Sequence, residues 1–486
     1  MSSPLAATRV IETLNVEDVS FTDKNLTWTS TGTSESTSRH ELVLVREVKS
    51  STESPSHYLL FLLKEDQGNE EHPCSLSILK TNEIPSELRN ITLAELPPHL
   101  KHDSANEHGI TNQVDVIVSV NSGVGQALRV WQNVLKPLWE SFTDDSEKQQ
   151  YRLIQTDSAE TVRDYARHLW ALEERSKTRT IVLLSGDGGV VDLLNGSDGD
   201  KVPRILPTIA LLPLGTGNAL FHSTHKPLYT EPGLRPLTIG LRTLFQGVGV
   251  DLPVFRASFS PGSRIVKFTD KVEGEASANG SNQIKKEETS ITHLQGAIVA
   301  SYGFHASIVY ESDTPEYRVH GDKRFGMVAA ELLKQSHPYA AKVAIRRHDS
   351  ATFEDIPREK HAYVLAVLVS NLERTFTISP ATRPLQSQLR LVHFGPIGGD
   401  RTMDVMMKAY DGGKHIGMDW ADGERVGYDE VDEVKISVLE SDERWRKVCI
   451  DGTIVEIPEG GDMAIKMLGR GLFKILASPR VLEDGI

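Results

Sequence analysis

Short apolar runs alternate with amphipathic segments in the middle of the chain. Val114–Val120, Ile181–Leu184 and Ile209–Leu212 are apolar runs of strand length. Between them, residues 126–140 and 158–175 carry apolar side chains at the spacing of one helix face. Repeated strand–helix units predict a parallel sheet covered by helices on both faces, with its ligand at the carboxyl ends of the strands.

The regions on either side of this α/β pattern are rich in strands. Before it, the apolar runs at 41–45, 57–63 and 75–79 predict a small β-rich region. After it, 294–301, 363–370 and the last third of the chain are strand-like. We therefore expect a small, partly disordered β-rich region at 1–110, an α/β lobe at 111–250, and a β-rich lobe at 251–486 with a disordered polar insertion at about 270–292.

Three of the predicted strands in the middle region lead into turns that contain glycine. The turns are Asn121–Gly125, Ser185–Gly189 and Gly215–Asn218. Glycine lets the backbone approach a ligand closely, and the start of a following helix directs free N–H groups at negative charge. Phosphate is therefore the expected ligand. Three such turns at one sheet edge predict a nucleotide site. The fold class expected is α/β, with a Rossmann-like nucleotide-binding lobe and a second lobe of antiparallel, sandwich-like sheets.

Asp187, inside the second turn, needs a separate explanation because a carboxylate is a poor ligand for phosphate. From the residues alone, three explanations stay open: a magnesium ion, a hydroxyl group to be deprotonated, or a cap on the turn.

Charge and composition exclude several classes of function. Lys and Arg total 53 against 67 Asp and Glu, and the resulting net charge of −14 disfavours nucleic acid and charge-driven binding to anionic membranes. The two cysteines, Cys74 and Cys449, fit no zinc spacing and indicate a reducing compartment. No secretory signal is visible in residues 1–20, and the longest apolar run, 363–369, is far shorter than the ~20 residues of a membrane span. We expect a soluble cytoplasmic protein without a transmembrane segment.

Residues from about 111 to 476 resemble the diacylglycerol kinase catalytic family, which includes sphingosine kinases, ceramide kinases and bacterial diacylglycerol kinases. Ser185-Gly186-Asp187-Gly188 is similar to the sphingosine kinase form of the family's Gly-Gly-Asp-Gly signature. Gly215-Thr216-Gly217-Asn218 resembles its second nucleotide loop. Tyr317-Arg318, Gly321 and Arg324-Phe325 resemble a pattern whose arginines reach the ATP phosphates, and Asp451-Gly452 resembles the start of a C-terminal Asp-Gly-Glu.

The resemblance implies an ATP-dependent lipid kinase that uses Mg²⁺ and phosphorylates a lipid hydroxyl, most closely that of a sphingoid base. The lipid would be presented at a membrane surface, so peripheral membrane association is expected. Asp187 would be the general base, and Asp451 and Asp192 would organise the metal. The implied nucleotide-binding residues are Ser119, Asn121, Ser122, Gly123, Gly125, Thr156, Ser185, Gly186, Gly188, Asp192, Gly215, Thr216, Gly217, Asn218, Arg318, Arg324, Asp451 and Gly452.

The implied lipid-binding residues are Ser185, Gly186, Glu311 and Asp313. The acid that would hold the polar lipid head is placed at Glu311 by counting from Tyr317. Counting from Tyr302-Gly303-Phe304 instead gives Ser307 or Val309.

The sequence departs from the family pattern at several positions. Ser119-Val120 stands where the family has Asn-Pro, Gln126 replaces a lysine, Asp192 replaces a glutamate and Thr453 replaces the last residue of Asp-Gly-Glu. These departures leave open a catalytically impaired relative that only binds lipid or nucleotide. A diacylglycerol or ceramide kinase and a soluble-substrate kinase of the NAD-kinase type also stay open.

Overall fold

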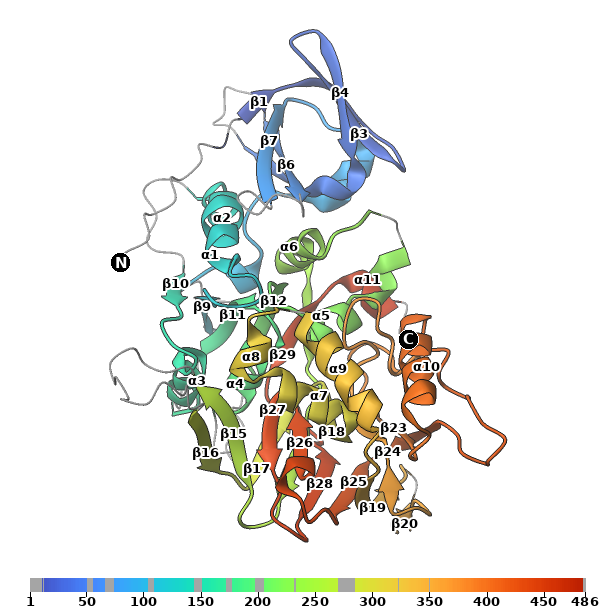
Figure 1. Ribbon diagram of the computed structural model, residues 1–486. Helices are drawn as coiled ribbons and strands as arrows, with labels where there is room; N and C mark the ends of the chain where they lie inside the picture. The colour runs from blue at the N-terminus through green and yellow to red at the C-terminus, as the bar shows by residue number, and fades with distance from the viewer. Residues whose placement is uncertain are drawn as a thin grey trace, which may run out of the picture.

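A central α/β part lies between two β-rich parts (Figure 1). The computed structural model describes residues 11, 13–49, 56–65, 74–103, 109–143, 151–171, 177–196, 205–230, 233–269, 285–321, 323–348 and 350–483. No helix in these ranges is long and apolar enough to cross a membrane.

The central sheet has the strand order β10-β9-β11-β12-β29-β13, and its strands from β10 to β29 run parallel. The last strand of the chain, β29, lies between β12 and β13, and β13 is antiparallel to it. The polypeptide therefore returns to the central sheet after building the C-terminal part. The bounds are β9 Thr111–Val118, β10 Arg152–Gln155, β11 Lys177–Ser185, β12 Thr208–Pro213, β13 Val248–Asp251 and β29 Lys474–Ala477.

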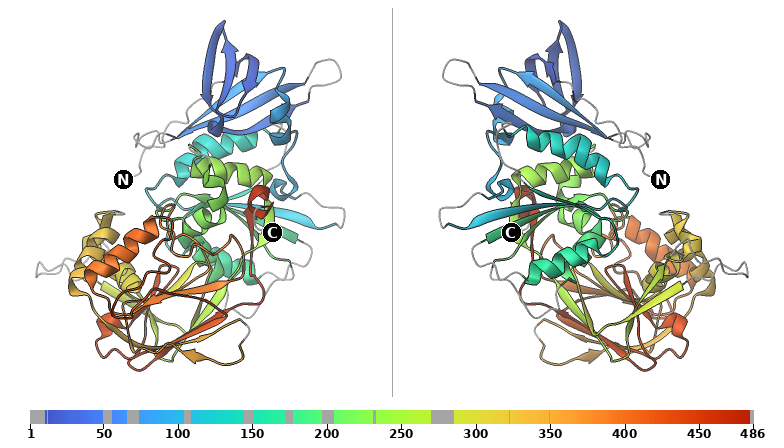
Figure 2. Two further views of the ribbon diagram at one scale, coloured as in Figure 1. Left: turned by 90° about the vertical axis from the view of Figure 1, so that its right-hand side faces the viewer. Right: turned by 90° about the vertical axis from the view of Figure 1, so that its left-hand side faces the viewer.

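Alternate residues of the parallel strands face opposite layers of helices. Val116 and Val182 pack with α6 (Pro236–Gln246) and the helical run at 127–140, whereas Ile117 and Ile181 pack with α3 (Thr161–Ala171) and α4 (Asp187–Leu194). Two apolar faces explain why these strands read as continuous apolar runs. Figure 2 shows the first helix layer lying between the central sheet and the N-terminal strands.

The helix predicted at 126–140 is present but irregular. It consists of α1 (Ala127–Val130), a π-helical turn at Trp131–Leu135 and α2 (Lys136–Glu140). Pro137 lies just after the π-helical turn. Proline has no N–H to donate to the preceding turn and its ring crowds that turn, so a local change of helical pitch is expected there.

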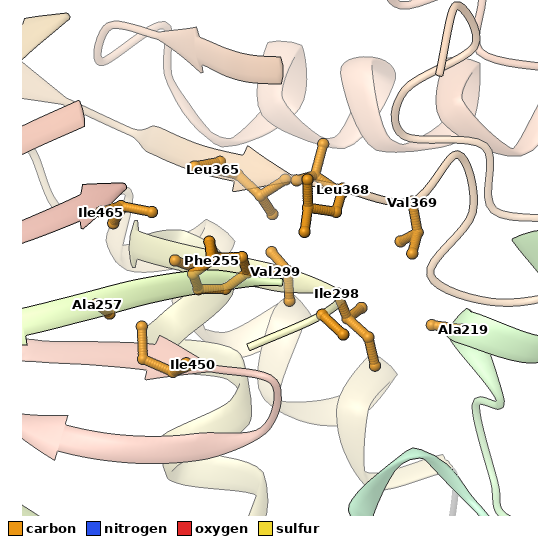
Figure 3. Close-up of a cluster of buried hydrophobic side chains, with 14 of the residues drawn as sticks. Ala219, Phe255, Ala257, Ile298, Val299, Leu365, Leu368, Val369, Ile450 and Ile465 are labelled. Carbon is orange, nitrogen blue, oxygen red and sulfur yellow. The ribbon is translucent and has the colours of Figure 1, made fainter. Parts of the chain in front are cut away.

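The C-terminal part is a sandwich of two antiparallel sheets, as predicted. The first sheet has the order β17-β14-β28-β25-β19-β20, with β21 paired to β19, and the second has the order β16-β15-β27-β26-β18-β22-β23-β24. Figure 3 shows Phe255 and Ile465 of the first sheet facing the buried side chains of the second sheet, such as Val299 and Leu365. The bounds are β14 Phe255–Phe259, β15 Arg264–Thr269, β16 Lys285–Ser290, β17 His293–Gly296, β18 Val299–Gly303, β19 Tyr339–Arg346, β20 Glu354–Asp355, β21 Lys360–His361, β22 Tyr363–Val367, β23 Leu389–Phe394, β24 Gly427–Val431, β25 Glu433–Val438, β26 Lys447–Ile450, β27 Thr453–Glu456 and β28 Asp462–Met467.

One expectation for this part needs correction. The predicted disordered insertion at about 270–292 contains a strand, because Lys285–Ser290 forms β16 and pairs with β15; residues 270–284 lie outside the described residues. Besides its strands, the last third of the chain contains a helix that the sequence analysis did not predict, α10 (Gly399–Tyr410), whose buried Thr402, Val405 and Ala409 follow helical spacing. The remaining helices of the C-terminal part are α7 Phe304–Ser312, α8 Pro315–Arg318, α9 Lys323–Gln335 and α11 Pro479–Glu483.

The N-terminal strands form two sheets, with the orders β1-β7-β6-β5-β8 and β2-β3-β4. They attach to the central part through α6, where the Arg242 guanidinium donates hydrogen bonds of 2.9 and 2.6 Å to the Leu42 carbonyl. The bounds are β1 Thr13–Asn15, β2 Glu17–Phe21, β3 Asn25–Ser30, β4 Thr33–Ser38, β5 Leu42–Val48, β6 His57–Glu65, β7 Cys74–Thr81 and β8 Thr92–Leu93.

A buried charge network joins three strands of the central sheet. Asp115 on β9 is 1% exposed. Its carboxylate accepts hydrogen bonds from Arg152 Nε on β10 at 2.7 Å, from the Tyr165 hydroxyl on α3 at 2.7 Å, and from Arg179 on β11. A buried carboxylate is tolerated only when it is paired in this way.

Replacing Asp115 by Ala leaves Arg179 beside an emptied buried position. We expect the free energy of unfolding to fall by about 3–5 kcal/mol. Urea unfolding followed by circular dichroism measures this loss. Glu95→Gln is the matched control, because its partner Lys101 is in an exposed pair worth less than about 1 kcal/mol. Equal losses in the two variants would contradict the role given to Asp115.

Candidate functional site

Three glycine turns meet at the carboxyl ends of β9, β11 and β12. Gly186 and Gly215 are in backbone contact, since a Cβ atom added to Gly215 would lie 2.4 Å from the Gly186 Cα. A Cβ on Gly123 would lie 2.5 Å from the Leu214 carbonyl oxygen. The Gly186 N–H also donates a 3.0 Å hydrogen bond to the Ser122 hydroxyl. Side chains at these glycines would force the turns apart, so glycine is required for their convergence.

Asp187 is the first residue of α4, and its carboxylate is held by a different helix. Its two oxygens accept hydrogen bonds from the Ala219 N–H at 2.7 Å and the Leu220 N–H at 3.1 Å. These donors open α5 (Ala219–Thr224), the short helix after the third turn. Burial raises the pKa of Asp187 to about 6, and the two N–H groups limit that rise by stabilising the charged form. Such a group is largely ionised at neutral pH yet basic enough to accept a proton.

Asp451 brings a second carboxylate to this site from the C-terminal part. It occupies the turn between β26 and β27 in the left-handed region at φ 46°. Its oxygens accept hydrogen bonds from the N–H groups of Ala297 at 2.6 Å, Ile298 at 3.1 Å and Val299 at 2.6 Å. Burial raises the pKa of Asp451 to about 7, and the charge of Asp187 contributes to that rise. The two carboxylates therefore interact electrostatically although 264 positions separate them along the chain (451 − 187).

Two of the predicted nucleotide-binding side chains shape the turns themselves. The Asn218 amide both accepts a hydrogen bond from the Gly215 N–H at 2.9 Å and donates one to the Gly215 carbonyl at 2.8 Å. The Thr156 hydroxyl accepts a 3.1 Å hydrogen bond from the Val120 N–H, which ties the first turn to the end of β10. Asn121, Gly123, Gly125, Thr216 and Gly188 are exposed in the turns, whereas Ser185 is buried.

The predicted phosphate-binding arginines have protein partners. Arg318 forms an ion pair with Asp313, with Nη2–Oδ2 and Nε–Oδ1 distances of 2.9 and 3.1 Å. It also donates a hydrogen bond to the Phe268 carbonyl. The Arg324 guanidinium lies 4.9 Å from the centre of the Phe325 ring. A phosphate would have to displace Asp313 from Arg318, so contact of these arginines with ATP stays a prediction.

The predicted lipid-binding and metal-binding acids also have protein partners. Glu311 accepts hydrogen bonds from Arg444 at 2.7 and 2.8 Å. Asp192 pairs with Arg163 of α3 at 3.2 Å, and burial raises its pKa to about 6. In the described ranges no three His, Cys, Asp or Glu side chains cluster in a way that could hold a metal ion. The structure thus brings Asp451 to Asp187 and directs Asp192 toward α3.

The residues that sequence reasoning missed are backbone donors. The N–H groups of Ala219 and Leu220, and those of Ala297 to Val299, hold the two carboxylates of the site. Apolar residues carry these donors, so side-chain chemistry gave no signal for them. The only local hint is that Ala219 directly follows the third turn, where a helix start is expected.

Known proteins resemble this chain in different degrees. No curated protein matches the sequence. A crystal structure of a diacylglycerol kinase from Bacillus anthracis str. Sterne is similar at 15% identity and a TM-score of 0.46, covering 76% of this chain and 98% of that chain. A putative diacylglycerol kinase from the same organism gives 15% identity, a TM-score of 0.48 and the same coverage. The family model of the diacylglycerol kinase catalytic domain matches residues 113–241, the stretch from β9 to α6 that carries all three glycine turns.

Proposed function

We propose that the protein is an ATP-dependent lipid kinase that phosphorylates a lipid hydroxyl. The observation that carries the proposal is the Asp187 carboxylate at the meeting point of three glycine turns, with a pKa of about 6. The match of residues 113–241 to a kinase domain supports the reaction class. The intact turns and Asp187 favour an active enzyme over an impaired relative.

The backbone N–H groups of the turns at 122–125 and 215–217 would bind the nucleotide phosphates. Such amides are fixed before the ligand arrives, so they stabilise the charge of the transferring phosphoryl group without reorganising. In the reaction, the acceptor oxygen forms a bond to the γ-phosphorus of ATP while the bond to the β-phosphate oxygen breaks. The hydroxyl proton passes to Asp187, and ADP leaves.

Among the described residues, the two acids expected to organise Mg²⁺ already have protein partners. Asp192 is paired with Arg163, and the Asp451 oxygens accept three backbone N–H groups. Mg²⁺ usually keeps several waters and binds largely through substrate phosphates in kinases. Any Mg²⁺ that accompanies ATP would therefore be held chiefly by the nucleotide.

For the acceptor we propose a sphingoid base. The support is the Ser185-Gly186-Asp187-Gly188 motif, which resembles the sphingosine kinase form of the signature. Glu311, the acid expected at the polar lipid head, is paired with Arg444 and would have to exchange that partner for the lipid. Diacylglycerol, ceramide and NAD are the competing acceptors, and peripheral binding to a membrane that presents the lipid is part of the proposal.

Transfer from radiolabelled ATP to sphingosine, diacylglycerol and ceramide in mixed micelles, and to NAD in solution, tests the proposal. We expect label on sphingosine. Label on diacylglycerol or ceramide alone would replace the proposed acceptor, label on NAD alone would overturn the lipid assignment, and no label on any acceptor would overturn the kinase proposal.

Asp187→Asn should lower kcat about 10²–10⁴-fold, because the amide cannot take the hydroxyl proton. Asp164→Asn is the control, because that carboxylate is an exposed partner of Arg167 on α3. Asp187→Asn with more than about a tenth of the normal rate would contradict the role of this residue.

In the unchanged protein, kcat/KM should fall as the pH drops below about 6. The reason is that the active form of Asp187 is the carboxylate, and its pKa is raised to about 6. A pH profile of kcat/KM measures this.

Gly215→Ala should weaken ATP binding by at least about tenfold, the effect of ~1.4 kcal/mol. The added methyl would lie 2.4 Å from the Gly186 Cα, so the second and third turns would have to separate. Titration with a fluorescent ATP analogue measures affinity, and thermal melting shows whether the variant is folded. Gly469→Ala is the control, since no atom lies within 4 Å of its added Cβ. Equal ATP affinity in both folded variants would refute nucleotide binding between these turns.

A further inference from the structure

Helix α5 is joined to the C-terminal part by a pair of buried hydrogen bonds. The Ser223 hydroxyl donates to the Asn371 carbonyl at 2.9 Å and accepts from the Asn371 N–H at 2.9 Å. Ser223 is 4% exposed and Asn371 is 3% exposed. One side-chain hydroxyl thus satisfies both main-chain groups of a residue 148 positions away, in the segment that follows β22.

The segment that receives Ser223 is itself fixed. The Asn371 amide donates hydrogen bonds to the Glu373 and Arg374 carbonyls at 3.3 Å and to the Thr377 hydroxyl at 3.1 Å. Asn371 and Thr377 also form a β-bridge. The same segment reaches the third glycine turn, because a Cβ on Gly217 would lie 3.4 Å from the Leu372 carbonyl oxygen. It is therefore a rigid anchor beside the site.

α5 depends on such an anchor for its position. The helix has six residues, and a helix of that length is not stable by itself, so tertiary contacts must place it. Ala219 at its start lies beside Ile298 and Val369 of the C-terminal part (Figure 3). Ser223, one helical turn further on, makes the polar contact across the same boundary.

We infer that Ser223 is a positioning residue: its paired hydrogen bonds to Asn371 hold α5 so that the Ala219 and Leu220 N–H groups stay directed at the Asp187 carboxylate. The inference rests on the proposed function, in which Asp187 accepts the proton of the lipid hydroxyl. Within the described residues, Asp451 is the titratable group whose pKa the charge of Asp187 raises.

The catalytic test compares Ser223→Ala with Ser223→Thr and Thr224→Val. Ser223→Ala removes both hydrogen bonds, and we expect about a tenfold lower kcat, the effect of ~1.4 kcal/mol. The acid limb of its kcat/KM profile should move to higher pH. Burial raises the pKa of Asp187 and the two N–H groups lower it, so weaker N–H donation leaves the pKa higher. Ser223→Thr keeps the hydroxyl and should restore the rate. Thr224→Val should behave as the unchanged protein, because Thr224 is a buried neighbour on α5 for which no cross-boundary hydrogen bond is present among the described residues.

Hydrogen exchange tests the same contact without relying on activity. We expect the amides of peptide 218–225 to exchange at least about tenfold faster in Ser223→Ala, with peptide 111–118 of β9 unchanged. Suppose that Ser223→Ala exchanges faster but the unchanged protein phosphorylates no acceptor. The hydrogen-bonded contact between Ser223 and Asn371 would then stand, and only the proposed function would be overturned. Unchanged exchange, or an unshifted acid limb in an active Ser223→Ala enzyme, would overturn the positioning role of Ser223.

Discussion

The site depends on the contact between the Asp187 carboxylate and the first two N–H groups of α5. Asp187 follows β11, and α5 follows β12, so the contact joins two neighbouring strand ends of the parallel sheet. It satisfies two backbone donors that a helix start leaves free, and it fixes the direction of the carboxylate. The Asp187 carboxylate can reach the N–H groups of α5 only because Gly186 and Gly215 approach each other closely. Any side chain at these two positions would separate the two turns.

The C-terminal part contributes to the site through backbone as well as side-chain groups. Asp451 approaches Asp187 from the turn between β26 and β27, and three N–H groups around Ile298 hold it there. Because the charge of Asp187 raises the pKa of Asp451, the ionisation of Asp451 depends on how the sandwich sits against the central sheet.

The sequence predicted the features that follow from local pattern. Continuous apolar runs ending in glycine turns indicated the parallel sheet and its ligand edge, and the motif around Asp187 indicated the kinase family. Hydrogen bonds and ion pairs between residues far apart in the chain could not be predicted from local pattern. The cap considered for Asp187 was a local one, whereas the carboxylate holds a helix 32 positions away. The pairing of Glu311 with Arg444, 133 positions apart, likewise comes from tertiary packing, and α10 lay in a region dominated by strand-like runs.

The central claim is that the three glycine turns bind a triphosphate whose terminal phosphate faces Asp187. A crystal structure with a non-hydrolysable ATP analogue tests it most directly. The terminal phosphate should lie against the turns, with space for one hydroxyl oxygen between it and Asp187, so that this oxygen is about 2.6–3.2 Å from the carboxylate. An analogue bound away from these turns, or a terminal phosphate on the far side of α4 from Asp187, would contradict it.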